Sequence, residues 1–73
     1  MHKHWIKFFN AQGHEYACIH TDCRIALRHM IDHARGLART RRHQKAHYFQ
    51  IVKETGSGKA NLEPLTEIIQ IRS

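Results

Sequence analysis

The chain has 73 residues, 12 Lys/Arg against 6 Asp/Glu, and a formal net charge of +6. This length allows one domain with a thin core, which leaves little room for an elaborate active site, and the basic balance favours an acidic partner such as nucleic acid. No stretch is apolar for long enough to span a membrane, residues 1–7 lack the apolar core of a signal peptide, and two cysteines without an export signal suit a reducing compartment. We therefore expect one cytoplasmic domain over residues 1–73, with no membrane partner.

Two strands are expected before the basic segment. Residues 4–9 are rich in aromatic side chains, and residues 10–13 contain the turn formers Asn10 and Gly13. Residues 14–20 then return in the opposite direction. This pattern predicts a β-hairpin.

The segment from residue 21 to about residue 45 has helical periodicity. When residues 22–38 are placed on a helical wheel at about 100° per residue, apolar side chains group in one sector. Its members are Cys23, Ala26, Leu27, Met30, Ala34 and Leu37. Thr21 is expected to cap the helix, with Asp22 at the positive end of the helix dipole. Gly36 either ends the helix as a glycine cap or lies inside a longer helix, which we favour because it buries Leu37.

A second sector of this helix is basic. Four arginines share a sector roughly 60° wide on the side opposite the apolar one, and Arg42 would join them in a longer helix. Residues 21–47 hold seven Lys/Arg and two Asp, a net charge of +5. The stripe would be on the order of 22 to 27 Å long, enough to meet several phosphates or a row of carboxylates. The predicted binding residues are Arg24, Arg28, Arg35, Arg39, Arg41, Arg42 and Lys45. The alternative is a basic helix face that is merely solvated.

Strand patterns return after the basic segment. Residues 46–53 have high β propensity, residues 54–64 form a long loop rich in turn formers, and residues 65–72 form the last predicted strand. The order ββαββ predicts an α+β fold, in which one helix covers one face of a small antiparallel sheet.

Alternation along the strands divides their side chains between two faces of the sheet. The face toward the helix is expected to hold Ile6, Phe8, Ala17, Ile19, Phe49, Ile51, Ile69 and Ile71. The second face is expected to hold Trp5, Phe9, Tyr16, Tyr48, Val52 and Ile68, with polar residues between them. One helix cannot cover both faces, so the second face is either ordinary half-exposed sheet or a contact site. The candidate partner surface, which includes contact in a homodimer, is Trp5, Phe9, Tyr16 and Tyr48.

No motif in the chain predicts catalysis or metal binding. His29 and His33 have i, i+4 spacing, but further ligands at zinc-finger or zincin spacing are missing. Residues 56–59 lack the first glycine and the Ser/Thr of a phosphate loop. A Cys and His pair is expected by chance in a chain with eight histidines. We therefore predict no catalytic residue, metal or cofactor.

These features favour a small non-enzymatic module that contacts nucleic acid or a nucleoprotein complex through the arginines, with little sequence specificity. The alternative is an interaction or inhibitor protein that docks on an acidic protein through the arginines or the aromatic sheet face. A small enzyme or metal protein is the least favoured class. In architecture alone, a ββαββ protein with a basic helix resembles small phage-encoded proteins, among them some anti-CRISPR inhibitors of ribonucleoprotein complexes. No motif carries this resemblance, so it assigns no functional residue.

Overall fold

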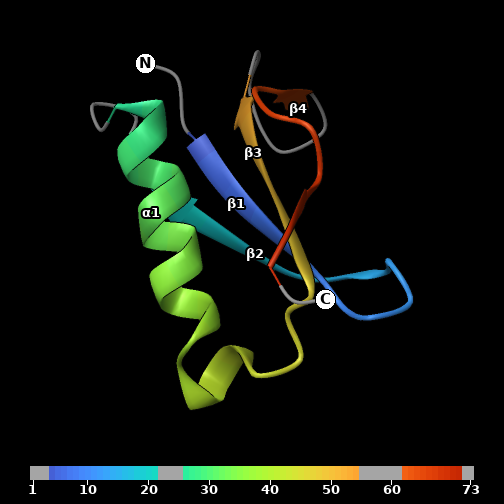
Figure 1. Ribbon diagram of the computed structural model, residues 1–73. Helices are drawn as coiled ribbons and strands as arrows, with labels where there is room; N and C mark the ends of the chain where they lie inside the picture. Colours follow the sequence, from blue (N-terminus) through green and yellow to red (C-terminus); the bar gives the residue numbers. More distant parts are fainter. Residues whose placement is uncertain (1–3, 22–25, 55–61, 72–73) are drawn as a thin grey trace.

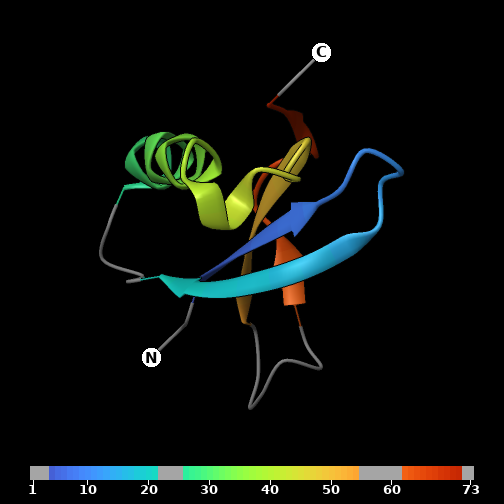
Figure 2. The same ribbon diagram turned by 90° about the horizontal axis from the view of Figure 1, so that it is seen from below.

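The computed structural model describes residues 4–21, 26–54 and 62–71. The element order is β1 (His4–Phe9), β2 (Glu15–Thr21), α1 (Leu27–Ala38), the 3₁₀ helix η1 (Arg41–His43), β3 (Tyr48–Glu54), β4 (Leu62–Pro64) and β5 (Ile69–Gln70). The strands form an antiparallel sheet in the order β2-β1-β3-β4, with β5 also paired to β3. Figure 1 and Figure 2 show α1 lying against one side of this sheet. The predicted α+β class, with the helix between the second and third strands, is confirmed.

The turn between β1 and β2 depends on the two residues that marked it in the sequence. The Oδ1 atom of Asn10 accepts hydrogen bonds from the backbone N–H groups of Gln12 and His14, both at 3.0 Å. The N–H of Gly13 donates to the carbonyl of Asn10 at 2.9 Å, and Gly13 has a φ of +80°. Glycine adopts this left-handed conformation without a Cβ clash, and asparagine bonds readily to nearby backbone. The predicted hairpin is confirmed.

A β-bulge in this hairpin reverses the direction of Tyr16. The register pairs Phe8 with Ala17 but Phe9 with Glu15, so Tyr16 is the extra residue of β2. An extra residue interrupts the alternation of side chains along a strand. Tyr16 therefore packs against the core on the helix side. The prediction that it lies on the second face is wrong, because strict alternation does not allow for a bulge.

Helix α1 begins later than predicted. Thr21 is the last residue of β2, where it pairs with His4 and is only 7% exposed. Its β-branched side chain suits a strand. Thr21 is therefore not the helix cap; the residue before α1 is Ala26, with extended backbone and no side-chain cap. The predicted helical positions of Asp22, Cys23 and Arg24 lie outside the described residues.

The C-terminal end of α1 agrees with the longer predicted helix in including Gly36, but α1 ends before residue 45. Gly36 lies inside α1, and Leu37 is half-buried against the core. The N–H and the hydroxyl of Thr40 both donate to the carbonyl of Leu37, at 3.0 and 2.6 Å, and the N–H of Arg39 donates to the carbonyl of Gly36 at 3.2 Å. These bonds satisfy the last helical carbonyls in a tight turn. The α-helix ends at Ala38, so Arg42 belongs to η1 instead.

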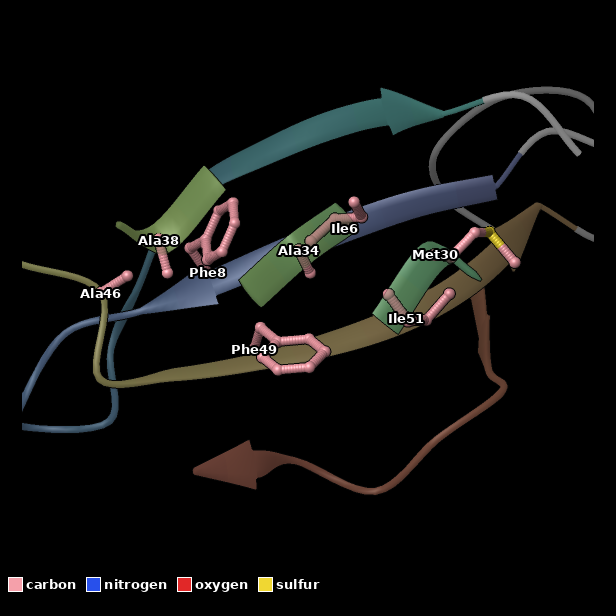
Figure 3. Close-up of a cluster of buried hydrophobic side chains, with 8 residues drawn as sticks. All are labelled: Ile6, Phe8, Met30, Ala34, Ala38, Ala46, Phe49 and Ile51. Carbon is pink, nitrogen blue, oxygen red and sulfur yellow. The ribbon is translucent and has the colours of Figure 1, made fainter. Parts of the chain in front are cut away.

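The hydrophobic core lies between α1 and the strands β1 and β3. Figure 3 shows the helix contributing Met30, Ala34 and Ala38 to it. The fully buried cluster is Ile6, Phe8, Met30, Ala34, Ala38, Ala46, Phe49 and Ile51. The two helical alanines let α1 approach the sheet closely. The inward face predicted for the sheet is confirmed, since its other four members, Ala17, Ile19, Ile69 and Ile71, pack partly buried against this cluster.

Two residues of the predicted apolar sector, Ala26 and Leu27, are not buried. Ala26 is exposed and precedes α1, and Leu27 is 38% exposed. Side chains on a helix lean toward its N-terminus. Leu27 is the first residue of α1. Its side chain therefore leans beyond the N-terminal end of the helix, away from the part that packs on the sheet. The prediction of Leu27 as a core residue is therefore wrong.

The C-terminal region differs most from the prediction. Leu62–Pro64, assigned to a loop, forms β4, and only Ile69–Gln70 of the long final strand is a strand. Between them, the Thr66 hydroxyl accepts a hydrogen bond from the N–H of Ile51 at 3.1 Å, and the Leu65 N–H donates to the Ile51 carbonyl at 2.8 Å. The Thr66 hydroxyl thus accepts the hydrogen bond that a backbone carbonyl of a neighbouring strand would otherwise accept from Ile51. The chain bends at this point instead of continuing as one strand.

Candidate nucleic-acid interface

The exposed cations of the described chain are concentrated in α1, η1 and the turn that follows. They are Arg28, Arg35, Arg39, Arg41, Arg42 and Lys45. Together with Asp32, the only acidic residue there, they give residues 26–47 six positive charges and one negative, a net charge of +5. The other described residues hold two Lys and four Glu, a net charge of −2. Charge is therefore segregated between the helical segment and the sheet.

The cations of the sheet already have acidic partners. Lys7 Nζ lies 3.3 Å from Glu15 Oε1, and Lys53 Nζ lies 3.8 Å from Glu63 Oε2. Within the described ranges, no arginine of α1 or η1 forms an ion pair. These guanidinium groups therefore present uncompensated positive charge to an acidic partner.

The arginines of α1 lie beside the buried face of the helix. The buried residues Met30, Ala34 and Ala38 recur every four positions. At about 100° per residue, Arg28, Arg35 and Arg39 lie roughly 120° from the middle of that buried face. The arginines are exposed, as predicted, but they lie to the side of the buried face instead of directly opposite it. The reason is that Ile31 and Ala38, outside the predicted apolar sector, also pack on the sheet side and move the buried face toward the arginines.

This position brings two of the arginines close to the C-terminal strand. Arg35 and Arg39 from α1 and Gln70 and Ile71 from the end of the sheet line a hollow of about 240 Å³. The sequence reasoning found the two arginines but missed Gln70 and Ile71 as their neighbours. No local signal marks these two residues, because the pairing of β5 with β3 alone carries them to this place.

The 3₁₀ helix presents Arg41 and Arg42 by burying the residue after them. His43 is only 6% exposed, and its ring stacks on Phe8 with centroids 4.7 Å apart and planes inclined by 28°. Its Nδ1 atom lies 3.5 Å from the hydroxyl of Tyr16. Burial lowers the pKa of His43, and the neighbouring Arg42 charge lowers it further. A neutral imidazole therefore anchors a short helix whose other two side chains are exposed cations.

Tyr16 positions the last cation of the segment. The Nζ atom of Lys45 lies 5.6 Å from the centroid of the Tyr16 ring, a cation–π arrangement. The carbonyl of Lys45 is 3.1 Å from Nδ1 of His47, which braces the turn leading to β3. The aromatic residue that the sequence assigned to the partner surface thus supports the basic segment instead.

The second face of the sheet is a separate surface. Trp5, Phe9 and Tyr48 are half-buried on it, whereas Val52 is only 2% exposed between its cross-strand neighbours Trp5 and Pro64. Trp5 meets the ring of His20 edge to face, with centroids 5.2 Å apart. This aromatic face carries the neutralised Lys7 and Glu15 pair, so it does not continue the positive charge of the helix.

His29 and His33 are exposed on α1. Among the residues that the structure describes, no three His, Cys, Asp or Glu side chains gather where they could hold a metal ion. The one α-helix of the described chain is too short to cross a membrane.

Comparison with family models, with curated proteins and with solved structures found no match to this chain. The functional argument therefore starts from the charge and geometry of the surface itself.

Proposed function

We propose that this protein is a small non-enzymatic cytoplasmic module that binds nucleic acid, alone or within a nucleoprotein complex, with little sequence specificity. The observation that supports the proposal is the run of exposed cations along α1, η1 and the following turn, which have no carboxylate partner among the described residues. We call it the arginine face, which consists of Arg28, Arg35, Arg39, Arg41, Arg42 and Lys45. Arg24, also predicted as a binding residue, lies outside the described residues.

The length of the arginine face suits a polyanion. From Arg28 to Arg39 the helix rises about 16 Å, at about 1.5 Å per residue. A DNA duplex carries one negative charge per about 1.7 Å of its axis, so a face of this length meets several phosphates. Guanidinium groups bind phosphate oxygens in a bidentate manner, and each neutralised phosphate releases counterions. The main driving force for binding is therefore electrostatic.

Low sequence specificity follows from where the arginines lie. Contacts to phosphates position a protein on nucleic acid, whereas contacts to base edges specify the sequence. Arg35 and Arg39 border a hollow with Gln70 and Ile71 beside the sheet, a position suited to a protruding phosphate group. Most contacts of the arginine face should therefore be to phosphates.

The test is the salt dependence of binding to random-sequence duplex DNA and to RNA. Each phosphate contact contributes about 0.9 to the slope of log K against log salt on duplex DNA. The double variant Arg28→Gln/Arg41→Gln should therefore lower that slope by roughly two units. The matched control, Lys7→Gln/Lys53→Gln, removes the same charge from the ion-paired sheet lysines and should leave the slope unchanged.

Two results would contradict the proposal. An equal loss of slope in both double variants would show that net charge alone matters and that the arginine face is not the interface. Failure of the wild-type protein to bind DNA or RNA at low salt would exclude nucleic acid as the direct partner. Nuclease-resistant capture of one acidic protein would then favour the alternative, an interaction or inhibitor protein. The half-buried aromatic residues Trp5, Phe9 and Tyr48 support that alternative, since protein interfaces are rich in aromatic side chains.

A further inference from the structure

The hollow between α1 and the C-terminal strand is distinct from the rest of the arginine face. Among the described residues it is lined by Arg35, Arg39, Gln70 and Ile71, which come from two segments far apart in the sequence. We call it the arginine hollow. Arg28, Arg41 and Arg42 are equally exposed but do not line it. Two residues of the arginine face, Arg35 and Arg39, thus border a concave site.

Both walls of the arginine hollow are fixed to the core. Arg35 and Arg39 are one helical turn apart and flank Ala38, which is buried against the sheet. On the other wall, the N–H of Ile71 donates to the carbonyl of His47 at 2.8 Å, and the Ile71 side chain packs against the core cluster. The Gln70 backbone pairs with Tyr48 in β3. The backbone of both walls is therefore held in place, and a ligand needs to order only the exposed side chains.

The size and lining of the hollow define the chemistry of its ligand. Pockets for small organic ligands span about 300–1,000 Å³. The hollow, at about 240 Å³, is smaller than that range, and two of its lining residues are arginines. In the described chain, neither Arg35 nor Arg39 forms an ion pair with a carboxylate. A single compact anion therefore fits better than a whole cofactor.

The number of donors favours phosphate over carboxylate. A carboxylate has two oxygens, and one guanidinium can engage both of them. Arg35 and Arg39 together provide two such forks. A tetrahedral phosphate presents more oxygens in more directions, so it can accept bonds from both forks at once. Partial enclosure beside the Ile71 side chain strengthens these charged contacts.

We propose that the arginine hollow binds one phosphate group bridged between Arg35 and Arg39. The assignment of that group to a nucleic-acid backbone rests on the proposed function. Inorganic phosphate has the same recognition chemistry and serves as the simplest probe. The hollow then acts as the anchor of the interface, while Arg28 and Arg41 make exposed contacts to neighbouring phosphates.

The first experiment is an NMR titration of the full chain with inorganic phosphate, against sodium chloride at equal ionic strength. We expect saturable shifts of the Arg35 and Arg39 side-chain N–H signals and of the Gln70 amide with phosphate only. Arg35→Gln or Arg39→Gln should weaken phosphate binding by about tenfold or more, because a charge-assisted contact in a concave site is lost. Arg28→Gln and Arg41→Gln are the matched controls and should leave phosphate binding unchanged.

The second experiment is a double-mutant cycle on binding to duplex DNA. Residues that share one partner are coupled, whereas well-separated residues act additively. The double variant Arg35→Gln/Arg39→Gln should lose less affinity than the product of the two single losses. Arg28→Gln and Arg41→Gln should each weaken duplex binding by only about two- to fivefold, and their effects should multiply in the double variant.

The outcomes separate this proposal from the proposed function. If duplex DNA binds but phosphate gives no saturable shift, or Arg35 and Arg39 act additively like the controls, the phosphate site is wrong while nucleic-acid binding stands. If phosphate saturates the hollow but the wild-type protein binds neither DNA nor RNA, the nucleic-acid assignment fails and the hollow remains a site for a free phosphate group. If neither binds, both proposals are overturned.

Discussion

The imidazole of His43 stacks on the ring of Phe8, with centroids 4.7 Å apart, and this contact joins the basic segment to the core of the sheet. Phe8 is fully buried near the end of β1, and His43 is the last residue of η1. The stack therefore holds η1, and with it the exposed Arg41 and Arg42, against the domain.

This burial of His43 makes stability depend on pH. The folded-state pKa of His43 lies below its ordinary value of 6.5, chiefly through burial and further through the Arg42 charge. Between the two pKa values the unfolded chain binds more protons than the folded chain, so stability falls as pH drops below 6.5 toward the folded-state pKa. Well above 6.5 the ring is neutral in both states and this dependence ends. The pH dependence of stability can be measured as the midpoint of denaturant unfolding at several pH values between about 5 and 8.

The control for this pH dependence is His43→Gln, which keeps a polar side chain but cannot titrate. The difference between wild type and variant isolates His43 from the other histidines and from the acidic residues. We expect the variant to be less stable, because the stack on Phe8 is lost, but with a smaller loss of stability on acidification. Parallel pH profiles of the two proteins would show that His43 does not carry the effect.

Two large apolar side chains of α1 should respond differently to truncation. Met30 is 1% exposed in the core, so Met30→Ala should destabilise the fold by about 2 to 5 kcal/mol. Leu27 is 38% exposed, so Leu27→Ala should cost about 1 kcal/mol or less. Thermal or urea unfolding compares the pair. Equal losses would place Leu27 in the core after all.

Two glycines should respond to alanine with opposite signs. Gly36 lies inside α1, and a Cβ there would meet nothing within 4 Å, so Gly36→Ala should stabilise by about 0.5 to 1 kcal/mol. Gly13 also has open space, but its φ is +80°, so Gly13→Ala should destabilise by about 1 to 2 kcal/mol. Because neither methyl group clashes, the difference in unfolding midpoint reports backbone conformation alone. Two changes of the same sign would contradict the assignment of these backbone conformations.

The second face of the sheet should be independent of the arginine face. Tyr48 lies on the side of the sheet away from α1, so Tyr48→Ser should leave the affinity for duplex DNA and its salt slope unchanged. A homodimer through this face would bury Trp5, the only tryptophan, so its fluorescence should then change with concentration in parallel with the mass in sedimentation. A monomer at every concentration, with every partner retained by Trp5 and Tyr48 variants, would exclude the face as a contact site.

Local sequence patterns determined the class of this fold and the inventory of its charged surface. Asn10 and Gly13 mark a turn because the bonds and the backbone conformation involved lie within a few residues of each other. The alternation of Ile6 with Phe8 and of Phe49 with Ile51 predicts the inward face of the sheet for the same reason. The exposure of the arginines on α1 follows from helical periodicity, which is also a local property.

The tertiary structure decided the features that depend on pairing between distant segments. The bulge that turns Tyr16 toward His43 arises from the register between β1 and β2, which no single strand contains. Thr21 ends a strand instead of capping a helix because His4 is available as its partner. The arginine hollow exists because β5 pairs with β3 and so carries Gln70 beside Arg35. Periodicity can assign a side chain to a face of its own element, but only the packing of whole elements decides which distant residues share a site.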